Sequence, residues 1–409
     1  MKNYIKKLYV ALKLNIIRSI ISVTIYRIIR KFSGTSLKKP FNTETIIFQK
    51  TNKHTFFGYY DIDPISKNDN FALVMVVPSD NRKMQKATIG YFNINKANSF
   101  QEIGETETWC WQQGCRLRWS KVDEDLIFYN KILQNQYGSV CQNIYDKKIV
   151  LTINHPIYDV NRGEKYGLSL NFSRLQRLRP GYGYEVFADS SIGSNSPGDD
   201  GVFIIDLKKN SSELIISLKE LSSFAPCETM INCQHYVNHL SFNPTGNRFL
   251  FFHLWTDGTF RKSRLFTSDI SGKNLCLLEN KENVSHYYWK NDREIIITTH
   301  SVKHGSRYSI YKDESKMKRL LSPSILNEDG HPSFCPLNHD IILSDTYPDK
   351  YGERSLFIFD TKTKEKKILD NFKSPIKYRG EYRCDLHPRW SSSGNIISFD
   401  STHQNGLRS

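Results

Sequence analysis

Histidine recurs at matching places in a repeated pattern that fills the second half of the chain. Four copies begin at His239, His286, His331 and His387, and each continues into an aromatic residue, a polar turn and an apolar strand. The copies start 47, 45 and 56 residues apart. A neutral imidazole binds metal ions and transfers protons near neutral pH, so histidines gathered by a repeat could serve either chemistry.

The hairpin expected in the stretch "HLSFNPTGNRFLFFH" (239–253) indicates how a repeat could gather these side chains. In an antiparallel hairpin, the start of the first strand and the end of the second lie at the same edge. We therefore expect His239 and His253 to lie close together, with His235 in the preceding loop. Neighbouring copies would add to that edge His286, His300, Arg307, His331, Tyr347, His387 and His403. A single such histidine is more often a packing residue, whereas four in register favour a functional site.

The repeat also defines the elements that must position these residues. A period of about 45 residues with only strand and turn signals is typical of a propeller blade of about four strands. Weaker copies lie upstream, and Arg116 takes the histidine position in one of them. We predict an all-β fold, a seven-bladed β-propeller over residues 41–409, with blades starting near 54, 115, 155, 239, 286, 331 and 387. The segment "TETIIFQK" (43–50) is expected to complete the last blade, because "NGLRS" stands where its third strand would begin.

Positive charge is concentrated at the start of the chain. The first forty residues hold ten Lys and Arg and no acidic residue, while the whole chain has 57 basic and 42 acidic residues. We predict that residues 1–40 form a basic amphipathic helix and linker, because one helical sector roughly 60° wide collects Lys2, Lys6, Lys13, Arg27 and Lys31. Such a helix favours an anionic membrane surface. A helix docked on the propeller and a secretion signal are the alternatives.

The amino-acid composition indicates where in the cell the protein acts and which kinds of partner it binds. The eight cysteines form no C-x-x-C pair, which favours a reduced, cytoplasmic protein. Together with the basic helix, this predicts a peripheral position at the inner face of the membrane. Nucleic acid is not an expected partner, because the body of the chain lacks basic stripes with interleaved aromatic residues.

Several long strings resemble those of a known group of proteins: "HTFFGYYDIDP", "WCWQQGCRLRW", "GLSLNFSRLQRLRPGYGY", "VNHLSFNPTGNRFLFFHLW" and "RCDLHPRWSSSGNIISFDSTH". From about residue 44 onward the chain resembles the seven-bladed propeller lyases that include ulvan lyases and, more distantly, oligogalacturonate lyases. Similar bacterial proteins belong to surface-polysaccharide gene sets. The resemblance implies β-elimination on a uronate-containing acidic polysaccharide.

That reaction needs a cation to neutralise the uronate carboxylate, a base to remove the adjacent proton and an acid to protonate the leaving oxygen. By resemblance, His235 and His253 bind or neutralise the carboxylate, Arg307 binds it, and Tyr347 is the base or acid. The long segment 162–200 adds a predicted substrate groove, in which arginines would pair with carboxylate or sulfate. The predicted substrate-binding residues are Arg174, Arg177, Arg179, Tyr182 and His239. A solvated surface excursion is the alternative for this segment.

A metal site is also predicted. Cys384 and His387, with His331 and His403 on the adjoining hairpin ends, could hold one divalent metal through sulfur and nitrogen. The resemblance implies zinc or manganese, since related lyases carry a metal. A free buried cysteine beside packing histidines is the alternative.

Two other functions remain open at the level of sequence. A glycosyltransferase or accessory enzyme of capsule or O-antigen biosynthesis would act on a lipid-linked oligosaccharide, which suits a position at the membrane. A propeller that only binds glycan or protein would need none of the proposed chemistry, since a propeller fold alone implies no reaction.

Overall fold

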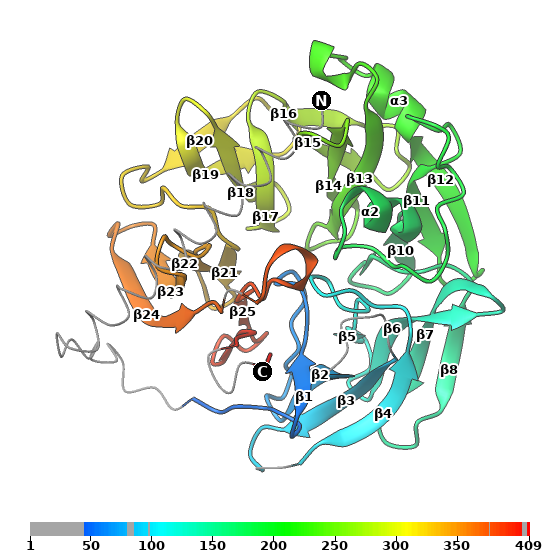
Figure 1. Ribbon diagram of the computed structural model, residues 1–409, viewed down its shortest axis with the longest axis vertical. Helices are drawn as coiled ribbons and strands as arrows, with labels where there is room; N and C mark the ends of the chain where they lie inside the picture. Colours follow the sequence, from blue (N-terminus) through cyan, green and yellow to red (C-terminus); the bar gives the residue numbers. More distant parts are fainter. Residues whose placement is uncertain (1–44, 80–85, 97–98, 376, 403–406) are drawn as a thin grey trace, which may run out of the picture.

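The computed structural model describes residues 45–79, 86–96, 99–375, 377–402 and 407–409. Within these residues, strands β1 to β24 form six antiparallel sheets of four strands each, arranged in a ring (Figure 1). Strands β25 and β26 form a separate two-stranded sheet. The all-β propeller predicted from the repeat is therefore confirmed.

The six blades follow one another along the chain. The first contains β1 (Lys53–Phe56), β2 (Phe71–Pro78), β3 (Ala87–Asn93) and β4 (Gln101–Thr106). The second contains β5 (Arg118–Trp119), β6 (Leu126–Leu133), β7 (Gln136–Asn143) and β8 (Ile149–Ile153). The third contains β9 (Asp159–Val160), β10 (Tyr166–Ser169), β11 (Gly201–Asp206) and β12 (Ser211–Ser217).

The remaining three blades lie in the half of the chain that carries the histidine repeat. The fourth contains β13 (Gln234–Phe242), β14 (Arg248–Thr256), β15 (Arg261–Asp269) and β16 (Cys276–Glu279). The fifth contains β17 (Asn283–Trp289), β18 (Glu294–Ser301), β19 (Gly305–Lys312) and β20 (Lys318–Leu321). The sixth contains β21 (Ser333–Cys335), β22 (Asn338–Asp345), β23 (Glu353–Asp360) and β24 (Lys366–Lys373).

Among the described residues, short helices lie in the loops between and within the blades. They are α2 (Phe172–Leu178), α3 (Leu218–Ser223), η1 (Glu228–Met230) and η2 (Gly380–Tyr382). Helix α2 interrupts the third blade between β10 and β11, so the long segment predicted to line a groove is an insertion into that blade.

The prediction of seven four-stranded blades is wrong. The seventh copy of the repeat yields only β25 (Arg389–Trp390) and β26 (Ile397–Ser398), two residues each. The described part of the segment expected to complete it, residues 45–50, forms no strand. The repeat was counted by its inner hairpin, and an inner hairpin alone does not specify the two outer strands that make a blade.

The ring is closed by residues near the C-terminus instead. Thr55 of β1 donates its backbone N–H to the carbonyl of Arg408 at 2.9 Å, and the backbone N–H of Arg408 donates to Nδ1 of His54. Ser409 exchanges two backbone hydrogen bonds with Ser401 beyond β26. The buried guanidinium of Arg408 donates to the carbonyl of Trp111 at 2.7 Å. Segment 407–409 thus joins the first strand to the last hairpin.

Continuous apolar runs form the middle strands because neighbouring blades cover both faces of each sheet. In β14, every residue after Arg248 is buried. Trp289, the aromatic residue three positions after His286, contacts the preceding blade, because its indole N–H donates to the carbonyl of Ser241 at 3.2 Å.

The predicted N-terminal amphipathic helix and linker fall on residues 1–40, which lie outside the described residues. In the part of the chain that the structure describes, no helix has the length and apolar character needed to cross a bilayer.

Candidate functional site

The repeated histidines meet at the inner ends of the blades, around Tyr59. The ring centroids of His286 and His331 are 4.1 Å apart, and those of His331 and His387 are 4.5 Å apart. Tyr59 stacks on His239 with a centroid distance of 5.2 Å and contacts His387 at 4.8 Å. All five side chains are buried. The repeat therefore brings one imidazole from each of four successive repeats into a single cluster.

The residue at the repeated histidine position has a left-handed backbone conformation in several repeats. His239 and His387 adopt left-handed conformations, with φ of +58° and +45°. Arg116, which takes the histidine position in the second blade, has φ of +56°. Such conformations cost a non-glycine residue on the order of 1 kcal/mol and are found preferentially at functional sites.

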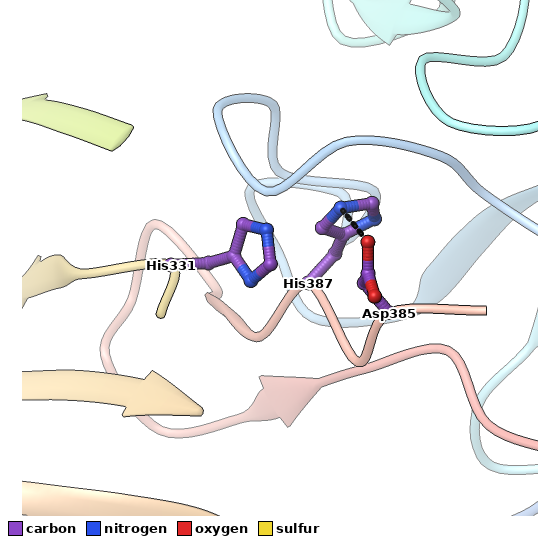
Figure 2. Close-up of side chains that lie close together, drawn as sticks. All are labelled: His331, Asp385 and His387. Carbon is purple, nitrogen blue, oxygen red and sulfur yellow. Dashed lines mark ion pairs between the residues drawn. The ribbon is translucent and has the colours of Figure 1, made fainter. Parts of the chain in front are cut away.

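Three side chains of the cluster form a candidate metal-binding group, which we call the metal group: His331, Asp385 and His387 (Figure 2). Their ligand atoms all lie within 4.8 Å of one another. Nε2 of His387 lies 3.9 Å from Oδ2 of Asp385 (Figure 2). All three residues are buried; Asp385 and His387 lie in the loop before β25, and His331 lies in the loop before β21.

The hydrogen bonds of the metal group leave its nitrogen lone pairs available. Nδ1 of His387 lies 2.8 Å from the carbonyl of Gly58, and Nδ1 of His331 lies 2.8 Å from a carboxylate oxygen of Asp345. Because carbonyl and carboxylate oxygens accept hydrogen bonds, each Nδ1 carries a proton, and a neutral imidazole held in this way presents the lone pair of its Nε2. Neither Nε2 has a hydrogen-bond partner among the described residues. This is the arrangement of metal-ligating histidines oriented by a second partner.

The charges of the metal group also suit a cation. Burial lowers the pKa of His387 well below its usual value, so its imidazole is neutral and able to ligate. Burial alone would raise the pKa of Asp385, but Arg383 and Arg354 lower it far below the usual range, so the carboxylate is ionised. Two imidazoles and one carboxylate form a donor set that zinc, manganese and iron accept.

Two other buried polar atoms of the cluster lack partners in the described part of the chain: the hydroxyl of Tyr59 and Nδ1 of His239. Buried polar atoms are normally hydrogen-bonded, so several unsatisfied atoms in one cluster point to a ligand. The observation supports a binding site and extends it beyond the metal group.

His286 stands beside the metal group; the repeat placed it at this edge, but no catalytic, substrate-binding or metal-binding role was predicted for it. Its Nδ1 lies 3.1 Å from Oδ1 of Asp329, and its Nε2 lies 3.5 Å from the hydroxyl of Tyr347. Burial lowers the pKa of His286 and raises that of Tyr347 well above its usual value. The pair therefore comprises a neutral imidazole, whose Nε2 lone pair faces the hydroxyl, and a neutral phenol.

The predicted metal ligands are only partly brought together. His331 and His387 belong to the metal group, whereas the buried thiol of Cys384 points to the carbonyl of Asp385, at 3.9 Å, and burial raises its pKa to about 11. His403 lies outside the described residues. Sequence reasoning missed Asp385, although the "DLH" spacing in "RCDLHPRW" offered a carboxylate as well as a thiol beside the histidine.

Arg383 connects the metal group to the predicted substrate-binding residues. Its Nε lies 2.6 Å from Oδ2 of Asp385, and its Nη2 donates to the hydroxyl of Tyr182. The guanidinium of Arg179 lies 4.0 Å from the centre of the Tyr182 ring. Burial would raise the pKa of Tyr182, but Arg179 and Arg383 lower it below its usual value.

The other predicted arginines have different surroundings. Arg174 is buried, and its guanidinium donates to the carbonyls of His235, Ser191, Ser194 and Asn195, so it fixes segment 191–195. Arg177 pairs with Asp189 at 2.7 Å. Arg307 is partly exposed on β19, opposite Thr299.

The predicted catalytic pair His235 and His253 lies in a separate hydrogen-bonded chain, which we call the histidine chain. Nε of Arg264 donates to Nδ1 of His253 at 3.0 Å, and Nε2 of His253 lies 2.8 Å from Nδ1 of His235. The guanidinium of Arg264 also donates to the carbonyls of Leu221 and Ala225. Burial lowers the pKa of both histidines, to about 4 for His235.

A cavity of about 610 Å³ opens where the loop between β14 and β15 faces α2. It is lined by Arg177, Leu178, Gln234, Thr256, Asp257, Gly258, Thr259, Phe260 and Arg261. Its lining combines two arginines, of which Arg177 is paired with Asp189, with the carboxylate of Asp257 and the ring of Phe260.

No protein-family model matches the chain, and no curated protein matches it in sequence. Solved structures do match. An oligogalacturonate lyase from Vibrio parahaemolyticus superposes with a TM-score of 0.61 and 12% identity, over 88% of this chain and 90% of that chain. An oligogalacturonate lyase in complex with manganese gives a TM-score of 0.62, with 12% identity and the same coverage. At this identity the similarity shows a shared propeller fold, and the expected relation to ulvan lyases stays a prediction.

Proposed function

We propose that the chain is a metal-dependent lyase that cleaves a uronate-containing acidic glycan by β-elimination. The observation that carries this proposal is the metal group, in which two oriented imidazoles and one ionised carboxylate converge with their ligand atoms within 4.8 Å. The fold shared with oligogalacturonate lyases, one of them a manganese complex, supports the same conclusion.

A divalent cation bound by His331, Asp385 and His387 would neutralise the uronate carboxylate and so acidify the proton beside it. The residues around the metal group fit the proton transfers. His286 is the base, because its Nδ1–H is held by Asp329 and the Nε2 lone pair of its neutral imidazole, which faces Tyr347, can accept a proton. Tyr347 is the acid, because its pKa is raised and the neutral phenol holds a proton to donate.

The substrate-binding part of the proposal concerns the residues between the cavity and the buried metal group. Arg179 and Tyr182 are joined to it through Arg383, and Arg177 lines the cavity by α2. A chain of acidic sugars could therefore run from the cavity to the metal group. Contacts join Arg179 to the metal group through Tyr182 and Arg383, which supports the inner part of this path.

The test is incubation of the purified protein with several uronate-rich glycans in the presence of manganese or zinc. Elimination creates an unsaturated uronate that absorbs in the ultraviolet. We expect a product signal that a chelator removes and that Tyr347→Phe and His286→Gln reduce at least a hundredfold. No unsaturated product from any acidic glycan, with metal bound, would overturn the lyase assignment.

The predicted membrane contact rests on residues 1–40 and the predicted cytoplasmic location on the cysteine pattern, and both stay predictions. A role in processing surface polysaccharide would follow if the lyase acts on a lipid-linked glycan at the membrane. Fractionation of the full-length protein, compared with a chain that lacks residues 1–40, tests this separately from catalysis.

A further inference from the structure

Tyr59 and Tyr60 are neighbours in the chain and both are buried, but their hydroxyl groups differ in their partners. The hydroxyl of Tyr60 donates to the carbonyl of Tyr287 at 2.6 Å and accepts from the backbone N–H of Tyr287 at 2.7 Å. The hydroxyl of Tyr59 has no hydrogen-bond partner among the described residues. Burying a hydroxyl without a hydrogen bond costs free energy, so the polar atom of Tyr59 points to a ligand and not to a role in packing.

His239 supplies a second buried donor, because its hydrogen bonds define where its ring proton lies. The hydroxyl of Tyr158 accepts from the backbone N–H of His239 and donates to Oδ1 of Asn238, both at 3.2 Å. Nδ2 of Asn238 therefore faces Nε2 of His239, at 3.2 Å. Since an amide nitrogen only donates, Nε2 is the acceptor and the ring proton lies on Nδ1. That Nδ1–H has no acceptor in the part of the chain that the structure describes.

Ring contacts place both donors beside the metal group. The ring of Tyr59 stacks on that of His239, with centroids 5.2 Å apart and planes at 19°. The centroid of Tyr59 lies 4.8 Å from that of His387 and 6.0 Å from that of His331. All four side chains are buried. The two donors and the two metal-binding imidazoles therefore share one buried region.

The two donors and the metal group are chemically complementary. The metal group offers lone pairs and a carboxylate to a cation, whereas Tyr59 and His239 offer hydrogens to an acceptor. An acceptor beside a cation is most stable when it carries negative charge, and hydrogen bonds to an ionised oxygen are the strong ones in a buried site. The chemistry of the two parts together fits an anionic group with more than one oxygen.

We propose that the hydroxyl of Tyr59 and Nδ1–H of His239 form an oxyanion site, which holds one oxygen of an anionic ligand group beside the cation at the metal group. Two neutral donors bind such an oxygen without an ion pair, so the site needs the cation for most of the charge neutralisation. The carboxylate of a uronic acid is a group of this kind. That identity rests on the proposed function, whereas the donor pair does not.

The first experiment compares Tyr59→Phe with Tyr60→Phe, each of which removes one buried hydroxyl from the full chain. In the metal-free protein, Tyr59→Phe should leave the urea midpoint of unfolding unchanged or raise it, because the lost hydroxyl has no partner in the described chain. Tyr60→Phe should lower the midpoint, because it leaves the backbone N–H and carbonyl of Tyr287 without that partner. An equal fall in both variants would assign the hydroxyl of Tyr59 to the fold and overturn the oxyanion site.

The second experiment measures binding of trigalacturonate to the manganese-loaded full chain by calorimetry. Tyr59→Phe should weaken this binding by about tenfold or more, since it removes a hydrogen bond to a charged group. Its manganese affinity should stay within about twofold of the unmodified value. Tyr60→Phe is the matched control and should keep the affinity for trigalacturonate. Unchanged affinity in Tyr59→Phe, or an equal loss in both variants, would overturn the proposal.

A third measurement separates failure of the oxyanion site from failure of the proposed function. If no uronide binds the unmodified protein, formate at constant ionic strength should still raise the melting temperature of the manganese-loaded unmodified protein and of Tyr60→Phe, but not that of Tyr59→Phe. That result would retain the oxyanion site and reject a uronide ligand. An equal effect of formate on all three proteins, or no effect on any of them, would reject the oxyanion site itself.

Discussion

The metal group and the histidine chain are both built from buried imidazoles, yet they differ in what is left unsatisfied. In the histidine chain, Arg264 can only donate, so His253 must accept at Nδ1 and donate from Nε2 to His235. In the metal group, Nε2 of His331 and of His387 has no partner in the described part of the chain. The hydrogen bonds of the histidine chain are satisfied within the protein, whereas the metal group has two Nε2 atoms that a metal ion could bind.

This difference shows why a count of histidines is a poor guide to function. The sequence places His387 at the start of one repeated hairpin and His253 at the end of another, two positions that it predicts to share an edge. Their hydrogen-bond partners differ. The guanidinium of Arg264 on β15 donates a hydrogen bond to the Nδ1 lone pair of His253, whereas the carbonyl of Gly58 accepts a hydrogen bond from Nδ1–H of His387 and leaves Nε2 without a partner in the described chain. The following predictions test whether the two regions differ as the geometry indicates.

The largest expected effect is on metal binding. His387→Ala removes one of three ligands, and we expect manganese affinity to fall by well over a hundredfold, since even outer partners of metal ligands contribute 10–100-fold. Calorimetric titration of the chelator-treated protein measures it. His300→Ala, on an exposed residue of β18, is the control. A variant that binds manganese as tightly as the unmodified protein would show that the metal group is not a metal site.

The second largest effect is expected on the free energy of unfolding, from a substitution in the histidine chain. His253→Ala removes a fully buried ring and leaves the Nε–H of Arg264 without an acceptor, so we expect a loss of about 3 kcal/mol in the free energy of unfolding. Urea unfolding of the metal-free protein measures it. Manganese affinity of the folded variant should stay within about twofold of the unmodified value. A large fall in affinity with unchanged stability would mean that His253 belongs to the functional site.

The sequence could predict part of the fold and part of the candidate site. The histidine repeat located the inner strands of the blades and the cluster of imidazoles, because strand pairing fixes which residues share an edge. It could not show that the copy at His387 forms only a hairpin, since outer strands carry no repeated residue. Nor could it choose Asp385 over Cys384, because that choice depends on Arg383 and Arg354, which keep the carboxylate ionised.

The smallest expected effect is a dependence of stability on pH that separates the two regions. Burial lowers the pKa of His235 from 6.5 to about 4 in the folded protein. Above pH 6.5 the imidazole is neutral in both states and stability is unaffected. Between these values the unfolded chain binds a proton that the folded chain does not, so stability falls as the pH falls.

We expect His235 to account for a loss on the order of 2 kcal/mol between pH 6.5 and pH 4. Urea unfolding across this range, compared between the unmodified protein and His235→Gln, isolates the contribution, because the histidines of the metal group are present in both. Saturating manganese should alter the pH dependence that comes from the metal group, since a metal competes with protons for Nε2. The difference between the two proteins should not respond to manganese, because His253 already occupies Nδ1 of His235. A difference that disappears when manganese is added would place His235 in the same site as His331 and His387.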